Sequence, residues 1–316
     1  MVGLKIGLDI GTGYVTAAVE GKGVVLCEPA VIALERETGN VLEVGSKAFE
    51  MTGRCPDAIK LVRPLLGGSI SELESSEKLL RAFLDKICKN KIFKPTVVAT
   101  VPAGITNLEK RNILGCILRA GAGRATLIEE PLAAALGIGV MLNKPYGTMI
   151  VNIGAGTTGV SVITMGSIAV AKSIPIGGNN MDKIIKTYLK VNRGVAVGRL
   201  TARELKHILG GAKMRDETIA AVAKGKSMSD GMPLFFEVTA QEINYAIRDC
   251  IDDLCQAITG VLEVTPPDLV KDITDDGIFL CGGMAKLYGL DKYIEEATGI
   301  KVKIPGNATN VAALGC

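Results

Sequence analysis

The chain of 316 residues contains no tryptophan and only one histidine, and aromatic residues make up 4% of it. Because hydrophobic residues still amount to 48%, its cores must be built from aliphatic side chains. The eight cysteines are scattered, with no Cys-x-x-Cys pair and no cluster of cysteine and histidine. This pattern argues against a zinc site and against Cys–His or Ser–His catalysis, and single thiols in apolar segments are typical of a reducing cytosol.

Other absences narrow the class of protein further. No apolar run approaches the roughly 18 residues of a membrane span, and the first residues lack the charged and apolar regions of a signal peptide. A net charge of +3 without a long basic run argues against nucleic-acid binding. The Gly-x-x-x-x-Gly-Lys-Ser/Thr motif of P-loop proteins does not occur. We therefore expect a cytoplasmic protein with no nucleic-acid partner.

One sequence pattern occurs twice, at residues 5–19 and 149–163. Each copy has an apolar strand, an acid or amide, Ile-Gly-x-Gly and a second β-branched strand, so that Asp9 corresponds to Asn152. Such a pattern predicts a hairpin whose tip carries little side-chain bulk, and its backbone N–H groups can surround a phosphate chain. Two of these hairpins predict two facing lobes that hold one nucleotide. The alternative is a pair of unrelated Gly-rich turns.

The rest of the chain has the pattern of an α/β protein, in which short β-branched strands alternate with helices. A hydroxyl three residues before a glutamate predicts a capping box at three helix starts: Thr106 with Glu109, Thr201 with Glu204, and Thr239 with Glu242. The third helix is the longest and ends before Pro266. The turn-rich stretch 143–147 predicts a boundary between a domain of residues 1–143 and a domain of residues 144–316.

Two carboxylates that follow predicted strands are candidates for chemistry. Asp9 could hold a hydrated Mg²⁺, which prefers water and one or two carboxylates as ligands, whereas Asn152 is its uncharged counterpart. Glu130 opens a helix, where it either stabilises the helix dipole or orients an attacking water molecule. The glycines Gly282 and Gly283, between a strand and a helix, would let an adenosine moiety approach closely.

These motifs occur in the order found in the actin, sugar-kinase and DnaK-type ATPase superfamily. Further segments resemble bacterial MreB, the actin-like shape protein, over essentially the whole chain: residues 21–34, 44–54, 63–70, 101–111, 127–139 and 262–273. The resemblance implies an actin-like fold of two lobes with the nucleotide in the cleft between them. Each lobe would have an RNase H-like core and a smaller insertion, around residues 30–70 in the first and 185–250 in the second.

The resemblance also implies roles for individual residues. Asp9 and Asp182 would lie near the metal, and Glu130 would position the hydrolytic water with Thr157 beside it. The ligands would be ATP or ADP with Mg²⁺. The residues around the nucleotide would be Thr12, Gly13 and Tyr14 in the first hairpin, Gly154, Ala155, Gly156 and Thr157 in the second, and Arg203, Glu204, Lys206, Gly282, Gly283, Met284 and Ala285 around ribose and adenine.

The chain departs from the family pattern inside this expected pocket. Amides replace carboxylates at Asn152 and Asn179, and a thioether replaces a glycine at Met284. These changes would weaken the metal site and narrow the pocket. We therefore expect a protein that binds nucleotide but is at most a slow ATPase.

Two classes of function remain open at the level of the sequence. The first is a cytoskeletal protein that supports cell shape and assembles with itself head-to-tail into filaments, since an open contact of this kind gives fibres. The alternative is a monomeric, degenerate actin-fold protein that acts as a nucleotide-binding regulator or scaffold. A sugar or acid kinase is disfavoured because no substrate carboxylate besides Asp182 is evident near residues 177–182.

Ile92 and Phe93 lie in a predicted loop with Lys89, Lys91 and Lys94. Apolar residues among lysines suit a peripheral contact with an anionic bilayer, and a similarly placed tip in MreB enters the membrane. The protein would then associate with the inner face of the membrane. The alternative is an ordinary loop whose phenylalanine packs back onto its own domain.

Overall fold

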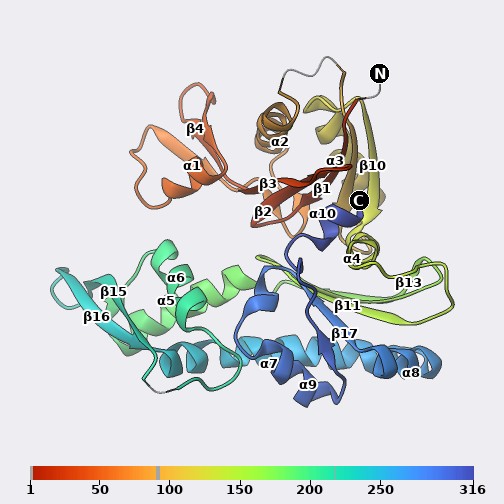
Figure 1. The fold of residues 1–316 in the computed structure, drawn as a ribbon. Helices are drawn as coiled ribbons and strands as arrows, with labels where there is room; N and C mark the ends of the chain where they lie inside the picture. Colours follow the sequence, from red (N-terminus) through yellow and green to blue (C-terminus); the bar gives the residue numbers. More distant parts are fainter. Residues whose placement is uncertain (1–2, 90–92, 217) are drawn as a thin grey trace.

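The computed structural model describes residues 3–89, 93–216 and 218–316. Two five-stranded sheets lie one above the other in Figure 1, and each contains one of the repeated hairpins. The first sheet has the order β10-β9-β1-β2-β3: β1 (Lys5–Ile10), β2 (Tyr14–Val19), β3 (Gly23–Pro29), β9 (Thr96–Val101) and β10 (Arg124–Glu129). The second has the order β13-β12-β11-β17-β18: β11 (Thr148–Ile153), β12 (Thr158–Thr164), β13 (Ser167–Ile174), β17 (Ile278–Cys281) and β18 (Val302–Lys303).

The first strand of each hairpin occupies the same place in its sheet. β1 pairs antiparallel with β2 and parallel with β9, and β11 pairs antiparallel with β12 and parallel with β17. In register, Asp9 lies opposite Thr16 on β2, and Asn152 lies opposite Gly159 on β12. The sequence repeat is therefore a structural repeat, and the predicted α/β class is confirmed.

The first lobe is completed by helices α2 (Leu73–Ile87) and α3 (Asn107–Arg119), which bury Phe83 and Ile117 in one core with Ile6 of β1. A smaller sheet of order β5-β4-β6 and a short hairpin precede α2. Their elements are β4 (Ile32–Glu35), β5 (Val41–Val44), α1 (Ser46–Glu50), β6 (Ile59–Val62), β7 (Leu65–Leu66) and β8 (Ser69–Ile70). This segment lies where the insertion around residues 30–70 is expected.

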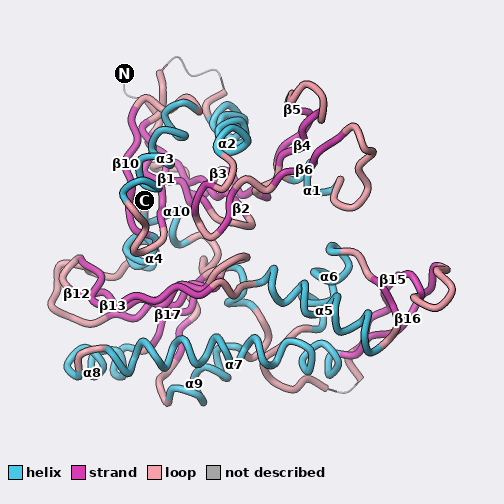
Figure 2. Tube along the Cα trace, turned by 180° about the vertical axis from the view of Figure 1, so that it is seen from behind, coloured by secondary structure: helices cyan, strands magenta, loops and turns pink. Residues whose placement is uncertain are grey.

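The second lobe has the corresponding parts. Helices α5 (Gly178–Asn192) and α7 (Ala240–Val264) bury Met181 and Ile247 in one core with Val151 of β11. A three-stranded sheet of order β14-β15-β16 lies at the far end of this lobe in Figure 2. The remaining elements are β14 (Val195–Ala196), α6 (Arg199–Leu209), β15 (Ala220–Ser227), β16 (Pro233–Thr239), α8 (Pro267–Asp276), the 3₁₀ helix η1 (Gly283–Lys286) and α9 (Leu290–Thr298).

Two short helices, α4 (Glu130–Ile138) and α10 (Val311–Gly315), join the lobes. Ile150 of β11 faces α4 and Val311, whereas its neighbours Met149 and Val151 face α5 and α7. β11 is an almost continuous apolar run, which suits a strand that is covered on both faces. α10 also touches the first sheet, where a Cβ atom at Gly7 would lie 2.4 Å from the Ala313 carbonyl oxygen. The last residues of the chain thus pack against the first lobe.

Two of the three predicted capping boxes are confirmed. Thr106 and Thr239 each accept a hydrogen bond from the backbone N–H three residues on, and the glutamate there accepts from the cap N–H. The box at Thr201 is wrong, because α6 begins at Arg199 with Gly198 as its N-cap. The Ala202 N–H already donates to the Gly198 carbonyl at 3.1 Å, so Thr201 lies within the first turn. α7 ends at Val264, as the prolines predict.

Within the described residues, no helix has the length and apolar character that crossing a membrane requires.

Candidate nucleotide-binding site

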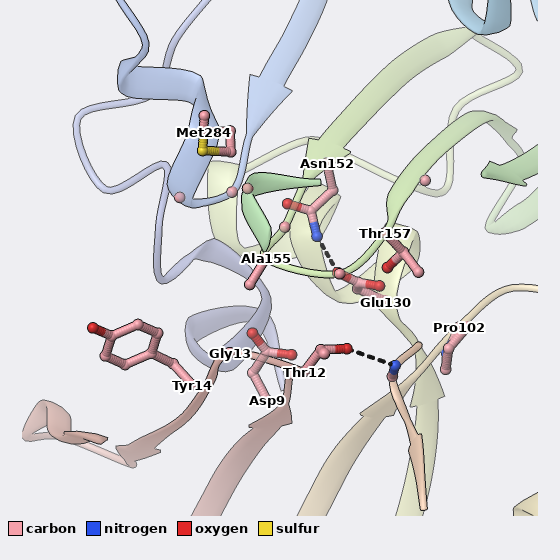
Figure 3. A pocket seen from close by; sticks show the side chains of 18 of the residues that line it. Asp9, Thr12, Gly13, Tyr14, Pro102, Glu130, Asn152, Ala155, Thr157 and Met284 are labelled. Atoms are coloured by element: carbon pink, nitrogen blue, oxygen red, sulfur yellow. Dashed lines mark hydrogen bonds between the residues drawn. The ribbon is translucent and has the colours of Figure 1, made fainter. Parts of the chain in front are cut away.

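A pocket of about 290 Å³ lies between the two lobes. Figure 3 shows that the two hairpin tips face each other across it. Its walls come from residues 9–14, 100–104, 130–131, 154–157 and 282–284, with contributions from α5 and α6. The predicted meeting of two Gly-rich hairpins is therefore present in the structure.

The two tips have the same backbone turn and contact each other. Gly11 N–H donates to the Tyr14 carbonyl at 3.0 Å, and Gly154 N–H donates to the Thr157 carbonyl at 2.9 Å. A Cβ atom at Gly13 would lie 2.4 Å from the Ala155 methyl. The absence of a side chain at Gly13 is thus what allows the lobes to approach this closely.

Groups outside the hairpins hold each tip in place. The first N–H groups of α5 cap the second tip: Gly178 donates to the Gly154 carbonyl at 3.0 Å, and Asn179 donates to the Ala155 carbonyl at 2.7 Å. The Gly68 N–H donates to the Thr12 hydroxyl at 3.3 Å, a bond drawn in Figure 3. Each tip is therefore fixed by its own lobe, which keeps its remaining N–H groups available for a ligand.

Two carboxyl groups face the pocket from the first lobe. Asp9 accepts a hydrogen bond from the Thr100 hydroxyl at 2.7 Å, and Glu130 accepts one from the Asn152 amide. Burial raises the pKa of Asp9 despite the Thr100 bond. Burial, followed by the charge of Asp9, raises the pKa of Glu130 to about 8. The pair therefore carries less negative charge near neutral pH than two ordinary carboxylates would.

These carboxyl groups fit a divalent cation, which would relieve their repulsion. No group of three or more metal-ligating side chains occurs in the part of the chain that the structure describes. Mg²⁺ suits such a sparse site because it keeps several water molecules and binds through one or two carboxylates and phosphate oxygens. The donor set is thus compatible with Mg²⁺ held chiefly by a nucleotide and by Asp9.

Asp182, which is expected near the metal, lines the pocket and pairs with a lysine. Its carboxylate forms an ion pair with the Lys206 ammonium at 2.6 Å, and the two residues are only 2% and 4% exposed. Lys206 also donates to the Gly178 carbonyl at 2.8 Å. Asp182 therefore fixes Lys206 against the wall of the pocket.

The turn after β17 is shaped by its glycine. Gly282 has φ of +89°, and a Cβ atom there would lie 2.3 Å from the Ile153 carbonyl oxygen, so only glycine fits. The Met284 side chain is 6% exposed and packs against Gly178. Its thioether lines the pocket at this point.

Two residues expected near ribose and adenine do not line the pocket. Glu204 lies on the exposed face of α6, and Ala285 is buried in the core of the second lobe. On an α-helix, neighbours in sequence point about 100° apart, so Arg203 and Lys206 can face the pocket while Glu204 cannot. The other expected binding residues line it.

Several residues of the pocket were not identified from the sequence. Thr100 is the penultimate residue of β9, Gly68 forms a turn with φ of +75°, and Arg63 follows β6. Only the Gly67–Gly68 pair carries a local signal, that of a tight turn. Thr100 and Arg63 reach the site because their separate strands end at the same edge of the fold.

The comparisons with known proteins agree with this architecture. The family model described as MreB/Mbl protein matches residues 3–316. The cell shape-determining protein Mbl of Bacillus cereus is 38% identical over 320 residues, which cover 100% of this chain and 95% of that protein. The cell shape-determining protein MreB of Escherichia coli (strain K12) is 35% identical over 316 residues, covering 98% of this chain and 91% of that protein.

Solved structures agree as well. The crystal structure of MreB5 of Spiroplasma citri bound to ADP matches with a TM-score of 0.94 at 30% identity, covering 99% of this chain and 94% of that chain. The MamK double helical filament matches with a TM-score of 0.82 at 20% identity, covering 99% and 97%, and shows a shared fold only. The expected actin-like fold is confirmed. The chain therefore belongs to the MreB/Mbl protein family.

Proposed function

We propose that this chain is an actin-like cytoskeletal protein that binds ATP or ADP between its lobes and assembles with itself into filaments that support cell shape. The observation that carries the proposal is the meeting of the two glycine hairpins beside Asp9 and Glu130, in a chain that matches the family over residues 3–316. The match over the full length disfavours the alternative of a degenerate monomeric regulator. Residues 1–143 and 144–316 would form the two lobes, joined by α4 and α10.

Each group in the pocket would have a distinct part in binding. Backbone N–H groups of Gly13, Tyr14, Gly156 and Thr157 would hold the phosphate chain. Lys206, fixed by Asp182, would face the sugar, and the turn at 282–284 would face the base. Mg²⁺ near Asp9 would neutralise charge on the phosphate oxygens when bound.

We propose that hydrolysis is slow. Glu130 would orient the attacking water with Thr157 beside it, but one Glu130 oxygen already accepts a hydrogen bond from Asn152. A pKa near 8 also leaves Glu130 largely protonated at neutral pH, until a bound cation lowers this pKa. A protonated acid is a poor acceptor for a water proton, so the pocket favours retention of ATP over rapid turnover.

Self-association is the part of the function most directly tested. We expect the purified protein to sediment at high speed with ATP and Mg²⁺ and to show filaments by electron microscopy. A protein that binds ATP but remains monomeric at micromolar concentration under all nucleotide and salt conditions would favour the regulator. Failure to bind ATP would overturn the proposed site itself.

We further propose a membrane contact through the loop before β9, which would place the protein at the inner face of the membrane. Phe93 is 48% exposed, and Lys94 beside it is exposed as well. Ile92 lies outside the described residues. An exposed aromatic ring next to a lysine is suited to the interface of an anionic bilayer.

A further inference from the structure

Two arginines line one end of the pocket, and a third lies near them. Arg63 follows β6 of the first lobe, and Arg199 and Arg203 belong to the first turns of α6 in the second lobe. Arg203 donates to the Tyr14 hydroxyl at 2.8 Å. Figure 3 shows Tyr14 on the side of Asp9 away from Glu130 and Thr157. The arginines therefore lie at the end of the pocket opposite the groups proposed to act on the terminal phosphate.

Among the residues that the structure describes, the three guanidinium groups contact neutral side chains. Arg203 lies over the rings of Tyr14 and Phe49, with its guanidinium carbon 5.4 and 5.0 Å from their centres, and Arg63 lies over Phe49 at 5.5 Å. Arg199 donates to the side-chain oxygen of Asn179 at 2.9 Å. None of the ion pairs found among the described residues includes one of these arginines.

Within the described part of the chain, the Arg63 guanidinium lacks a hydrogen-bond partner for one of its nitrogen atoms. Its Nη2 atom is buried and has no hydrogen-bond partner in the described structure. Burial, with the nearby charges of Arg199 and Arg203, lowers its pKa to about 10. The charge of Asp182 acts on Arg63 in the opposite direction, but Asp182 is already paired with Lys206. This end of the pocket therefore has an excess of positive charge that an anion would neutralise.

We propose that this end of the pocket binds a phosphate group separate from the phosphate chain at the hairpins, so that the site binds a nucleotide with an added phosphate on its ribose more tightly than the same nucleotide without it. Planar guanidinium groups bind phosphate through paired N–H donors, and Arg63 and Arg203 both line the pocket. A phosphate on the 2′ or 3′ oxygen is separated from the terminal 5′-phosphate by the sugar, as the two groups of binding residues require. The inference rests on the proposed nucleotide site.

The effect of a ribose phosphate on affinity can be measured by comparing two ligands with AMP. These are adenosine 2′,5′-bisphosphate and adenosine 3′,5′-bisphosphate. Calorimetry on the full chain should show at least one bisphosphate binding about tenfold or more tightly than AMP, as expected for charge-assisted contacts. The preference should fall to near unity in the double variant Arg63→Gln with Arg199→Gln. The control variant Arg111→Gln, at an exposed arginine on α3, should keep it. A melting temperature for each variant verifies that it folds.

Inorganic phosphate is titrated in parallel to separate the two sources of phosphate. If it binds with the same dependence on Arg63 while neither bisphosphate exceeds AMP, the arginines bind free phosphate and the proposal is overturned. Equal affinities for AMP and both bisphosphates, without phosphate binding, also overturn it. In both cases ATP binding would remain intact. Loss of ATP binding in the unmodified protein would instead contradict the proposed function.

Discussion

Gly156 lies so close to Thr12 that a Cβ atom on the glycine would stand 2.8 Å from the threonine methyl. The contact joins the tip of the second hairpin to the tip of the first, across the site proposed for the phosphates. The two lobes can therefore lie this close together only because Gly156 has no side chain.

The first prediction concerns this contact. In Gly156→Val, the added side chain should push the tips apart and occupy the phosphate path, so ATP affinity should fall by about tenfold or more, or about 1.4 kcal/mol. Calorimetry measures the affinity. Gly306→Ala is the matched control, because its Cβ atom would meet nothing within 4 Å. Unchanged ATP affinity in Gly156→Val would falsify the placement of the phosphates.

The second prediction concerns the amide at Asn152. Asn152→Asp should supply a carboxylate for the metal and release Glu130 from its hydrogen bond, increasing phosphate release roughly a hundredfold in Mg²⁺. The same variant should melt at a lower temperature than the natural protein in EDTA, because another carboxyl group would then lie beside Asp9 and Glu130. If the natural protein already releases phosphate as fast as the variant, the amide does not slow the reaction.

The third prediction is a pH dependence of stability without nucleotide or metal. The pKa of Glu130 is raised in the folded protein to about 8, so between about pH 4.5 and pH 8 the folded state holds a proton that the unfolded state has lost. The free energy of unfolding should therefore decrease as pH rises through this window. The decrease is about 1.4 kcal/mol for each pH unit over which Glu130 is protonated in the folded state and ionised in the unfolded state. Urea unfolding in EDTA measures this loss. It should be smaller in Glu130→Gln, and an equal loss in both proteins would assign the effect to other groups.

The fourth prediction concerns the buried ion pair. Asp182→Asn should leave the Lys206 charge buried and unpaired and reduce stability by about 3–5 kcal/mol. Asp276→Asn is the matched control: Asp276 also pairs at 2.6 Å with a lysine, but with both side chains more than one third exposed, so about 0–1 kcal/mol is expected. Urea midpoints compare the two. If Asp182→Asn instead keeps its stability and loses Mg²⁺ affinity in the presence of ADP, Asp182 is a metal ligand after all.

The fifth prediction concerns the proposed membrane contact. Phe93→Ser should reduce sedimentation with anionic lipid vesicles severalfold, since it removes the exposed ring beside Lys94. Phe235→Ser, at a phenylalanine that is 69% exposed on β16, provides the comparison. Equal binding by both variants and the natural protein would mean that the ring at Phe93 makes no contribution.

Local patterns in the sequence were sufficient for several parts of this structure. The glycines at 11 and 13 and at 154 and 156 determine two tight turns, because their backbone conformations and hydrogen bonds involve only the next few residues. Thr106 and Thr239 determine helix starts for the same reason. The two hairpins also predicted two facing lobes and one nucleotide, and the resemblance to MreB then implied the roles of individual pocket residues, which periodicity alone does not contain.

Other features were decided only by the tertiary structure. Thr201 has the spacing of a capping box, yet α6 begins earlier, because Gly198 takes the extended conformation of an N-cap. The resemblance places Asp182 near the metal, but its ion pair with Lys206 arises only from the packing of α5 against α6. Arg63 lies in the inserted segment, far in sequence from Arg199 and Arg203, and meets them only where the two lobes approach.

The difference between features that the local sequence predicts and features that only the tertiary structure decides has a physical cause. A turn or a helix cap is stabilised by hydrogen bonds between residues three or four positions apart, so its energy is contained in a short segment of sequence. The charge balance of the pocket depends on side chains from both lobes whose desolvation and mutual repulsion exist only after the lobes pack together. The amino-acid pattern thus determined the hairpins that can hold phosphate, and only the folded chain decided which acids and arginines surround them.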